Sequence, residues 1–360
     1  MDVHPGVKVT LQELKAMHLA DLEVQEKYGV KYHRFWLNEE SETVFCLMHG
    51  PNKQACMAVH EEAHGGLPCN IIEVLPGEYE FFLGQSKLHD EDRAHLTEEV
   101  PDTGFRIFIH IDTLCPSSDA YSRVRSIIGE ALSTFNGREI EHLGEGIRCV
   151  FTSSLLAVEF AIAVQKALVR SAVEKSEKGG VPIELGMGIC ASNPVTDSSD
   201  KFFGGVLNSA SSLSNVAKCG QILISSKVKA HFLKESTNSG SLQRLKVLDY
   251  SDEKFLTALT DVTNQKLGED GFNVYKLSRA MGISRPQLYR KLTSLTGQSP
   301  KDFIREKRLK KAFKLIQQNF GNISEIALEV GFNNPSYFSR YFQKRFGFLP
   351  SAYAEIAKLH

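Results

Sequence analysis

The chain has 360 residues, of which 42% are hydrophobic and 24% are charged, and its formal net charge is −1. This composition is ordinary for globular proteins, and at roughly 100–200 residues per domain the length predicts two to four domains. No apolar run approaches the ~18 residues that cross a bilayer, and Met1–Pro5 lacks the basic and apolar layout of a signal peptide. The seven scattered cysteines, without a CxxC pair, indicate reduced thiols rather than a disulfide framework. We therefore expect a cytoplasmic protein with no membrane partner.

Charge is distributed unevenly along the chain. Phe272–Ala357 contains 15 Lys/Arg against 5 Asp/Glu, a net of +10, so the remaining residues sum to −11. A basic module on an acidic body is typical of a domain that meets nucleic-acid phosphates, although a basic stretch can equally be a solvated face. Eight of the twelve histidines precede Leu96. The two ends of the chain therefore differ in their chemistry.

Residues 1–82 have the pattern of a compact α+β domain. Thr10 is suited to cap a first helix, and Gly65 to end a second one. The polar stretch 83–104 is expected to be a linker. The predicted elements are helices over Val9–Tyr28 and Asn52–His64, a hairpin of Val30–Leu37 and Thr43–Met48, and a last strand over Asn70–Leu75.

The second predicted helix carries residues with metal-ligand spacing. His60 and His64 are four positions apart, so both imidazoles project from one helix face, and Cys56 lies one turn earlier. Imidazole and thiolate suit nickel, copper and zinc. Paired histidines on a helix are also common as ordinary surface residues, so the spacing alone leaves both interpretations open.

Four tracts resemble the family of small ferredoxin-like nickel-binding domains. They are Met1–His4, Met17–Leu22, Val44–Leu47 and Val59–Gly65, within a resemblance that spans residues 1–74. It implies a ferredoxin-like fold and a nickel ion, or another late first-row divalent metal, as cofactor. It also extends the set of expected ligands, within one chain or across a dimer, to His4, His18, Cys56, His60 and His64.

Residues 105–235 alternate strand and helix patterns, which predicts an α/β domain. The stretch 236–270 is rich in Ser, Asn, Asp and Lys and is expected to be a second linker, although Leu242–Leu248 has the pattern of one more strand. The predicted strands are Arg106–Ile111, Ile147–Phe151, Pro182–Ile189 and Gln221–Ser225, and the predicted helices are Tyr121–Phe135, Ser154–Val173, Leu207–Ala217 and Val228–Phe232.

This middle region resembles the class III adenylate/guanylate cyclase catalytic domain, which implies a ferredoxin-like core. The resemblance rests on Phe108–Ile111, Gly137–Phe151, Gly204–Leu213 and Gly220–Ser225. In active members two aspartates hold two metal ions, an asparagine positions the ribose, and an arginine stabilises the transition state. The resemblance places these four roles, in that order, on His110, Glu145, Asn208 and Ser212.

The middle region lacks cyclase chemistry at two of these positions. His110 is a poor replacement for an aspartate, because hard divalent metals prefer oxygen ligands. Asp112, two residues later and on the same face of the predicted strand, offers a carboxylate that could partly compensate. Ser212 cannot neutralise transition-state charge as an arginine does. We expect no catalytic residues and no enzyme activity here, with nucleotide binding as an alternative. Because cyclase domains pair, we expect a dimerisation platform.

The C-terminal region nearly repeats itself. Val274–Met281 and Ser284–Leu295 predict a helix-turn-helix, and Ser324–Val330 with Asn334–Phe346 predict another, 49 residues later. A glycine marks each turn, and a proline stands four residues beyond it. Lys301–Gln318 predicts a long, lysine-rich helix between the units. Two such units on one rigid helix would present two recognition helices to one face of a DNA duplex.

This arrangement closely resembles the AraC family DNA-binding domain over residues 271–357, an all-α fold. In the second helix of each unit, leucines and phenylalanines at the spacing of one helix face would pack into the core. Polar residues on the opposite face would reach base edges or phosphates. Linker-helix lysines would add phosphate contacts. Arg290 or Arg308 can alternatively be a structural ion-pair partner. The expected DNA-binding residues are Arg285, Gln287, Tyr289, Arg290, Asn334, Ser336 and Arg340, with Lys307 and Lys311 on the linker helix.

The sequence as a whole predicts a sequence-specific, DNA-binding transcription regulator. A metal or small ligand bound in the N-terminal two-thirds would control it. The alternatives are a nucleotide-responsive regulator or residual cyclase that uses the middle domain, and a metal store. The expected partners are double-stranded DNA and a second copy of the chain in a homodimer, and RNA polymerase is a further partner that such a regulator would contact.

Overall fold

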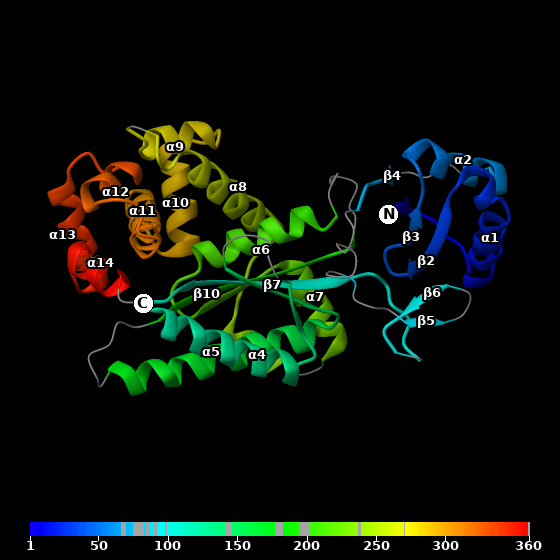
Figure 1. Ribbon diagram of the computed structural model, residues 1–360, viewed down its shortest axis with the longest axis horizontal. Coiled ribbons are helices and arrows are strands. Elements are labelled where there is room, and N and C mark those ends of the chain that lie inside the picture. Colours follow the sequence, from blue (N-terminus) through cyan, green and yellow to red (C-terminus); the bar gives the residue numbers. More distant parts are fainter. Residues whose placement is uncertain are drawn as a thin grey trace. The chain divides into compact units, whose positions relative to one another are not determined.

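A computed structural model describes residues 1–65, 70–74, 83, 87–89, 92–97, 99–140, 146–176, 183–194, 202–236, 239–269 and 271–358. They form two compact units, one of Met1–Ile107 with Ala191–Leu207 and one of Phe108–Cys190 with Asn208–His360. The N-terminal two-thirds of the chain contains two sheets with helices, and the C-terminal region is all helical (Figure 1). This confirms the predicted fold classes. None of the described helices is both long and apolar enough to cross a membrane.

The sheet of the first unit has the strand order β4-β1-β3-β2-β6-β5. The first four strands in this order are antiparallel neighbours and, with two helices, follow the order strand, helix, strand, strand, helix, strand of a ferredoxin-like fold. The elements are β1 (Asp2–Pro5), α1 (Leu11–Val24), the 3-10 helix η1 (Gln25–Tyr28), β2 (Lys31–Asn38), β3 (Thr43–His49), α2 (Lys53–His64) and β4 (Asn70–Ile71).

Local sequence signals begin and end the two helices of this unit. Thr10 and Glu13 form a capping box at the start of α1, in which each side chain bonds the backbone of the other. Asn52 accepts a hydrogen bond from the backbone of Ala55 at the start of α2. Gly65 ends α2 with φ +67°, a conformation that glycine adopts at little cost. These caps agree with the predicted helix boundaries.

Residues 83–104 contain regular structure where a linker was expected. Strands β5 (Lys87–His89) and β6 (Arg93–His95) are antiparallel neighbours, and β6 runs parallel to β2, which leaves β5 at the edge of the sheet. Asp102 is fully buried and accepts two hydrogen bonds from Arg106, at 2.8 and 2.7 Å, and one from Trp36 at 3.1 Å. The polar composition therefore led to a wrong prediction of a linker, because charged residues such as Asp102 and Arg106 pair with each other inside the unit.

The second sheet has the order β12-β11-β10-β7-β9-β8. Strands β10, β11 and β12 are parallel neighbours, and β8 and β9 are antiparallel. Figure 1 shows α4 and α5 on one face of the sheet and α6 on the other. The elements are β7 (Arg106–Leu114), α4 (Ser118–Thr134), β8 (Arg138–Glu139), β9 (Ile147–Phe151), α5 (Ser154–Ser176), β10 (Glu184–Ser192), α6 (Gly204–Val216), β11 (Gln221–Ile224) and α7 (Ser226–Glu235).

Residues 236–270, the second expected linker, are mostly ordered into elements. They contain η2 (Ser239–Arg244), the short strand β12 (Lys246–Val247) and the helix α8 (Tyr250–Lys266). The expected strand over Leu242–Leu248 is thus reduced to two residues. Asp249 caps α8 through the backbone of Asp252. The sequence did not predict this helix because its exposed face is polar, so that the segment has the composition of a linker. Its buried face carries Leu256 and Leu259.

The C-terminal region consists of six helices, with the long α11 between two helix-turn-helix units (Figure 1). Its core gathers aromatic side chains, including Phe313, Phe338, Phe342 and Tyr353, and also receives Leu114 from β7. The region therefore packs against the second sheet within one unit. The helices are α9 (Val274–Ala280), α10 (Arg285–Thr296), α11 (Pro300–Gln317), α12 (Ile323–Glu329), α13 (Pro335–Phe346) and α14 (Pro350–Lys358).

Candidate metal centre and nucleic-acid interface

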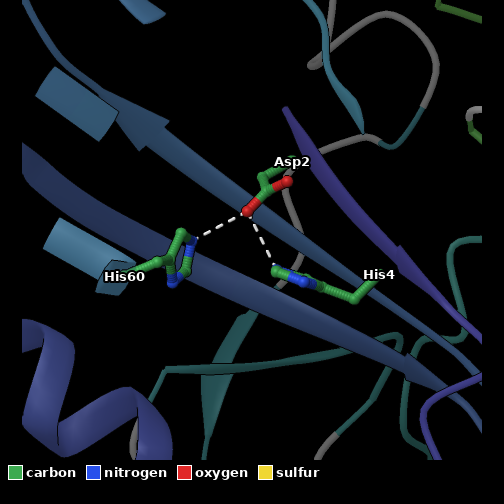
Figure 2. Close-up of side chains that lie close together, drawn as sticks. All are labelled: Asp2, His4 and His60. Carbon is green, nitrogen blue, oxygen red and sulfur yellow. Dashed lines mark hydrogen bonds and ion pairs between the residues drawn. The ribbon is translucent and has the colours of Figure 1, made fainter. Parts of the chain in front are cut away.

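His60 lies at the centre of a buried cluster of imidazoles and carboxylates. Its Nε2 is 2.8 Å from Asp2 Oδ2 and its Nδ1 is 3.2 Å from Asp21 Oδ1. His4 Nε2 lies 2.9 Å from the same Asp2 oxygen, as Figure 2 shows, and His64 Nε2 lies 3.3 Å from the Asp21 oxygen. The ligand atoms within each trio, Asp2-His4-His60 and Asp21-His60-His64, lie within 4.8 Å of one another.

Regular structure brings these five side chains together. Asp2 and His4 are two positions apart on β1, so they point to the same face of the sheet. His60 and His64 are four positions apart on α2 and share a helix face. Asp21 comes from α1, which contacts α2. The cluster therefore joins one strand and two helices of the ferredoxin-like fold.

The charges in the cluster depend on one another. Burial raises the pKa of Asp2, but hydrogen bonds from His4 and His60 outweigh it and hold the pKa below its usual value. Burial lowers the pKa of His60, but bonds to Asp2 and Asp21 outweigh it and raise the pKa to about 9. In the metal-free protein a proton on His60 thus neutralises part of the carboxylate charge.

A divalent cation fits this donor set. Asp2 Oδ1 is buried and has no hydrogen-bond partner among the described residues, so it has capacity for a further ligand. Three imidazoles and two carboxylates suit late first-row metals. A bound metal would supply positive charge where a proton now sits, and its binding would release that proton. The residues that would hold the ion are Asp2, His4, Asp21, His60 and His64.

The structure corrects the predicted ligand set at two positions. His18 lies outside both trios, with its Nε2 3.3 Å from Asp92 Oδ2 and its ring against Phe35. Cys56 is buried in the hydrophobic core beside Val59, and burial raises the pKa of its thiol. The sequence analysis missed Asp2 and Asp21, although both stand in tracts that carried the family resemblance. The signal for Asp2 was its position two residues before His4, because alternate residues of a strand point to the same face of the sheet.

The second helix of each helix-turn-helix unit is exposed on its polar face and buried on its apolar face. Ser284 caps α10 and Asn334 caps α13. The predicted packing residues Leu288, Leu292, Leu295, Phe338 and Phe342 are buried. The predicted base-reading residues, all exposed, are Arg285, Gln287, Tyr289, Arg290, Asn334, Ser336 and Arg340.

Two of these residues, Asn334 and Arg340, also make contacts within the protein. The side-chain oxygen of Asn334 accepts hydrogen bonds from the backbone of Ser336 and Tyr337, so only its amide nitrogen is left for DNA. The guanidinium of Arg340 lies 5.3 Å from the ring centre of Tyr337, which holds it on the exposed surface.

A basic groove of about 740 Å³ lies between the two helix-turn-helix units. Its cations come from α10 and α11, and Tyr275 and Tyr337 stand at its sides. Arg308 donates a hydrogen bond to the backbone carbonyl of Phe272 at 3.0 Å. It therefore has a structural role, and its bonding partner is a backbone oxygen rather than the carboxylate of an expected ion pair. Its lining includes residues at the N-terminal ends of both α10 and α13, Arg285 and Asn334. The lining cations are Arg285, Lys301, Arg305 and Arg308.

The two linker-helix lysines named from the sequence do not face solvent freely. Lys307 is 8% exposed and its Nζ donates to the Asn215 carbonyl at 2.8 Å, so it points to the second sheet's helix α6 rather than to DNA. Lys311 pairs with Glu329 at 3.0 Å. The expectation for Lys307 was wrong because the helical pattern gave no sign that this face of α11 packs against another part of the chain.

Two of the four positions named from the cyclase resemblance, His110 and Asn208, form hydrogen bonds within the protein. His110 is buried, and its Nδ1 lies 2.6 Å from Ser214 Oγ. Gly146 faces it with φ +85°, and a Cβ there would approach the imidazole to 2.6 Å. Asn208 donates to Asp261 of α8. Glu145 lies outside the described residues, and the buried Ser212 hydroxyl has no hydrogen-bond partner among the described ones.

Two family models match parts of the chain. Residues 1–74 match the model described as nickel responsive protein SCO4226-like, and residues 277–356 match the model described as helix-turn-helix domain. The histidine kinase P4 of Formosa agariphila is 39% identical over 102 residues, 28% of this chain and 7% of that protein. The HTH-type transcriptional regulator MtrA of Neisseria gonorrhoeae is 34% identical over 85 residues, 24% of this chain and 28% of that protein. The chain thus spans less than a third of either relative.

Two solved structures are similar to parts of the chain. SCO4226 from Streptomyces coelicolor A3(2) shares 38% identity over 20% of this chain and 90% of its own, with a TM-score of 0.20. An adenylate/guanylate cyclase/hydrolase from Silicibacter pomeroyi shares 20% identity over 37% of this chain and 82% of its own, with a TM-score of 0.32. By the family models and the sequence relatives, residues 277–356 are similar to helix-turn-helix transcription regulators, and residues 1–74 are similar to the SCO4226-like nickel responsive family.

Proposed function

We propose that this chain is a sequence-specific, DNA-binding transcription regulator. The observation that carries the proposal is the pair of exposed polar faces on α10 and α13, held on one rigid basic domain with buried aromatic cores. Recognition helices held in this way enter successive major grooves on one face of a duplex. The basic groove between them supports the same conclusion, because a DNA backbone needs cations where it crosses from one groove to the next.

The experiment measures binding to genomic fragments, including the chain's own promoter, by fluorescence anisotropy at fixed salt. Base readout by Arg285 and Gln287 on α10 predicts that R285A/Q287A loses discrimination between specific and random DNA. We expect a loss of about tenfold or more, since one good bidentate contact contributes about 1–3 kcal/mol. The matched control is K229A, which removes an exposed charge from α7. Equal binding to all fragments by the unmodified protein would refute the proposal.

We further propose that a nickel-type metal bound by the His60 cluster controls DNA binding. The support is the fit of the donor set and the family match of residues 1–74. By joining β1, α1 and α2, a metal would change the rigidity of the sensing domain, and a second copy of the chain in a homodimer would transmit that change. Linked sites of this kind typically shift affinity by roughly 5–150-fold.

DNA affinity with and without Ni²⁺, Zn²⁺ and ATP tests the control. A metal-dependent shift that H60A/H64A abolishes supports the metal sensor. Tight metal binding with unchanged DNA affinity would instead identify a metal store. A shift with ATP alone would place the signal in the cyclase-like region, where His110 and Ser212 lead us to infer no cyclase activity.

A further inference from the structure

The first helix-turn-helix unit is attached to the second sheet at the C-terminal end of its recognition helix, α10. Lys246, the first residue of β12, donates hydrogen bonds from its Nζ to the backbone carbonyls of Ser294 and Leu295. These carbonyls belong to the last turn of α10, where the helix itself supplies no donors. Lys218, between α6 and β11, lies beside Gly297, since a Cβ on that glycine would approach Lys218 Nζ to 2.7 Å. Two cations thus meet the negative end of the α10 dipole.

A third lysine attaches the side of α10 to α8. Lys291 of α10 donates from its Nζ to Ser251 Oγ at 3.0 Å and lies 3.3 Å from Asp252 Oδ1. The same ammonium group lies 5.0 Å from the centre of the Phe255 ring. All three partners belong to the first two turns of α8, the helix that follows β12. α10 is therefore bonded at its end and along its side by two consecutive elements of the chain.

The second helix-turn-helix unit is attached to the same sheet, again at the C-terminal end of its recognition helix. Arg345 lies in the last turn of α13 and binds both carboxylate oxygens of Glu184, the first residue of β10. Strands β10 and β12 are both parallel neighbours of β11, and Glu184 and Lys246 stand at the starts of their strands. Both attachment points therefore lie toward one end of the sheet, two strand spacings or about 10 Å apart across the strands.

This shared attachment matters because the two helix-turn-helix units have separate cores. The buried cluster around Phe313, Phe338 and Phe342 contains no residue of α9 or α10 among those that the structure describes, and the basic groove lies between the units. Helix α11 contacts both units, but a connection through one helix does not by itself fix their relative tilt. Strands bonded to one another do hold two anchor points at a constant separation, because sliding would break the whole ladder of hydrogen bonds.

We propose that the second sheet sets the separation of the two recognition helices, and that Lys246 and Glu184 thereby determine which spacing of two DNA half-sites the chain accepts. This role rests on the proposed DNA-binding function. The attachments lie at the C-terminal ends of α10 and α13, so the exposed Arg285, Gln287 and Ser336 at the opposite ends stay accessible to bases. One added base pair rotates a half-site by roughly 35° about the duplex axis, and two helices held rigidly cannot follow that rotation.

The distance between the recognition helices tests the proposal without DNA. Spin labels on genetically encoded amino acids at the exposed positions of Gln287 and Ser336 leave the native cysteines unlabelled, and double electron–electron resonance of the full chain gives the distribution of distances. We expect a distribution at least about twice as broad in K246Q/E184Q as in the unmodified chain, because loss of the attachments populates further arrangements. An unchanged width would overturn the proposal.

The matched control is K229Q/E355Q. It removes one positive and one negative charge, as K246Q/E184Q does, but at exposed positions of α7 and α14. It should keep the width of the unmodified chain, and equal broadening in the two double variants would overturn the proposal. K291Q, which removes the bonds of α10 to α8, should also broaden the distribution. If K246Q/E184Q does not fold, an unchanged width in K291Q overturns the proposal instead.

Selection from a random duplex library tests the consequence for DNA. We expect the unmodified chain and K229Q/E355Q to enrich two short motifs at one spacing, and K246Q/E184Q to enrich the same motifs at several spacings. In anisotropy titrations its preference for the original spacing over one a base pair longer should fall by about fivefold or more, as for other linked sites. Retention of the single spacing would overturn the proposal alone, whereas enrichment of no motif by the unmodified chain would refute the DNA-binding function and this role with it.

Discussion

At the scale of single residues, His60 is the side chain on which the metal centre depends. It is 2% exposed and belongs to both trios, while His4 and His64 belong to one each. H60A should therefore weaken Ni²⁺ or Zn²⁺ binding by at least about tenfold, because it removes a donor common to both trios. Calorimetric titration of the full chain measures the effect. H33A, at an exposed histidine of β2, is the control, and equal losses in the two variants would contradict the assignment.

Asp102 makes the stability of the first unit depend on pH. Burial raises the pKa of its carboxyl, but Arg106 and hydrogen bonds outweigh it and hold the pKa below the ordinary value of 3.8. A carboxyl with a depressed folded-state pKa stabilises the protein above its unfolded pKa, and this contribution is lost as the pH falls toward the folded pKa. The unit should thus lose stability progressively below about pH 5.

The variant D102N tests this assignment. It leaves Arg106 buried without its partner, so we expect a loss of about 3–5 kcal/mol at pH 7 and a flatter decline below pH 5. Trp36, the single tryptophan, bonds Asp102, so its fluorescence during urea unfolding reports on this unit. E39Q, at an exposed carboxylate, should keep the original profile. Parallel pH profiles for D102N and the unmodified chain would show that another carboxyl governs the decline.

At the scale of elements, α11 presents two different basic faces. Lys301 and Arg305 line the groove between the two helix-turn-helix units, whereas Lys307 is buried against α6. We expect K301Q to weaken binding to all DNA sequences alike and to reduce the salt slope by about one, as removal of one phosphate contact does. K307Q should leave the salt slope unchanged. Anisotropy titrations at several salt concentrations compare the two, and equal slopes would contradict this division of the helix.

Elements were more predictable from the sequence than contacts between them. The caps Thr10, Asn52, Ser284 and Asn334 and the periodicity of apolar residues locate most helices, because these signals are local. The strands β5 and β6 and the helix α8 were missed, since their polar residues bond distant partners: Glu253 of α8, for example, accepts hydrogen bonds from the backbone and hydroxyl of Ser226. The burial of Lys307 and the roles of Asp2 and Asp21 depend on the tertiary arrangement, which periodicity does not encode.

At the scale of the whole molecule, three contacts, one each from α11, α13 and α14, help to join the C-terminal helices to the second sheet and to the residues that follow β7, within the second unit. Gln317 donates to the carbonyl of Cys115 at 2.6 Å, and Tyr353 to that of Pro116 at 3.3 Å. Arg345, on the recognition helix α13, binds both oxygens of Glu184 on β10 at 2.6 Å. The orientation of α13 is thus fixed partly by a residue of the second sheet.

Removal of the Glu184 charge should loosen this connection without unfolding the domain. In E184Q, Arg345 keeps its bonds to Glu306 on α11, so α13 remains folded but loses its link to β10. Because the pair is part-exposed, we expect only about a tenfold fall in hydrogen-exchange protection of the α13 amides. E355Q, an exposed charge change on α14, is the matched control. If α13 exchanges equally in both variants, the Arg345–Glu184 pair does not hold α13 to the second sheet.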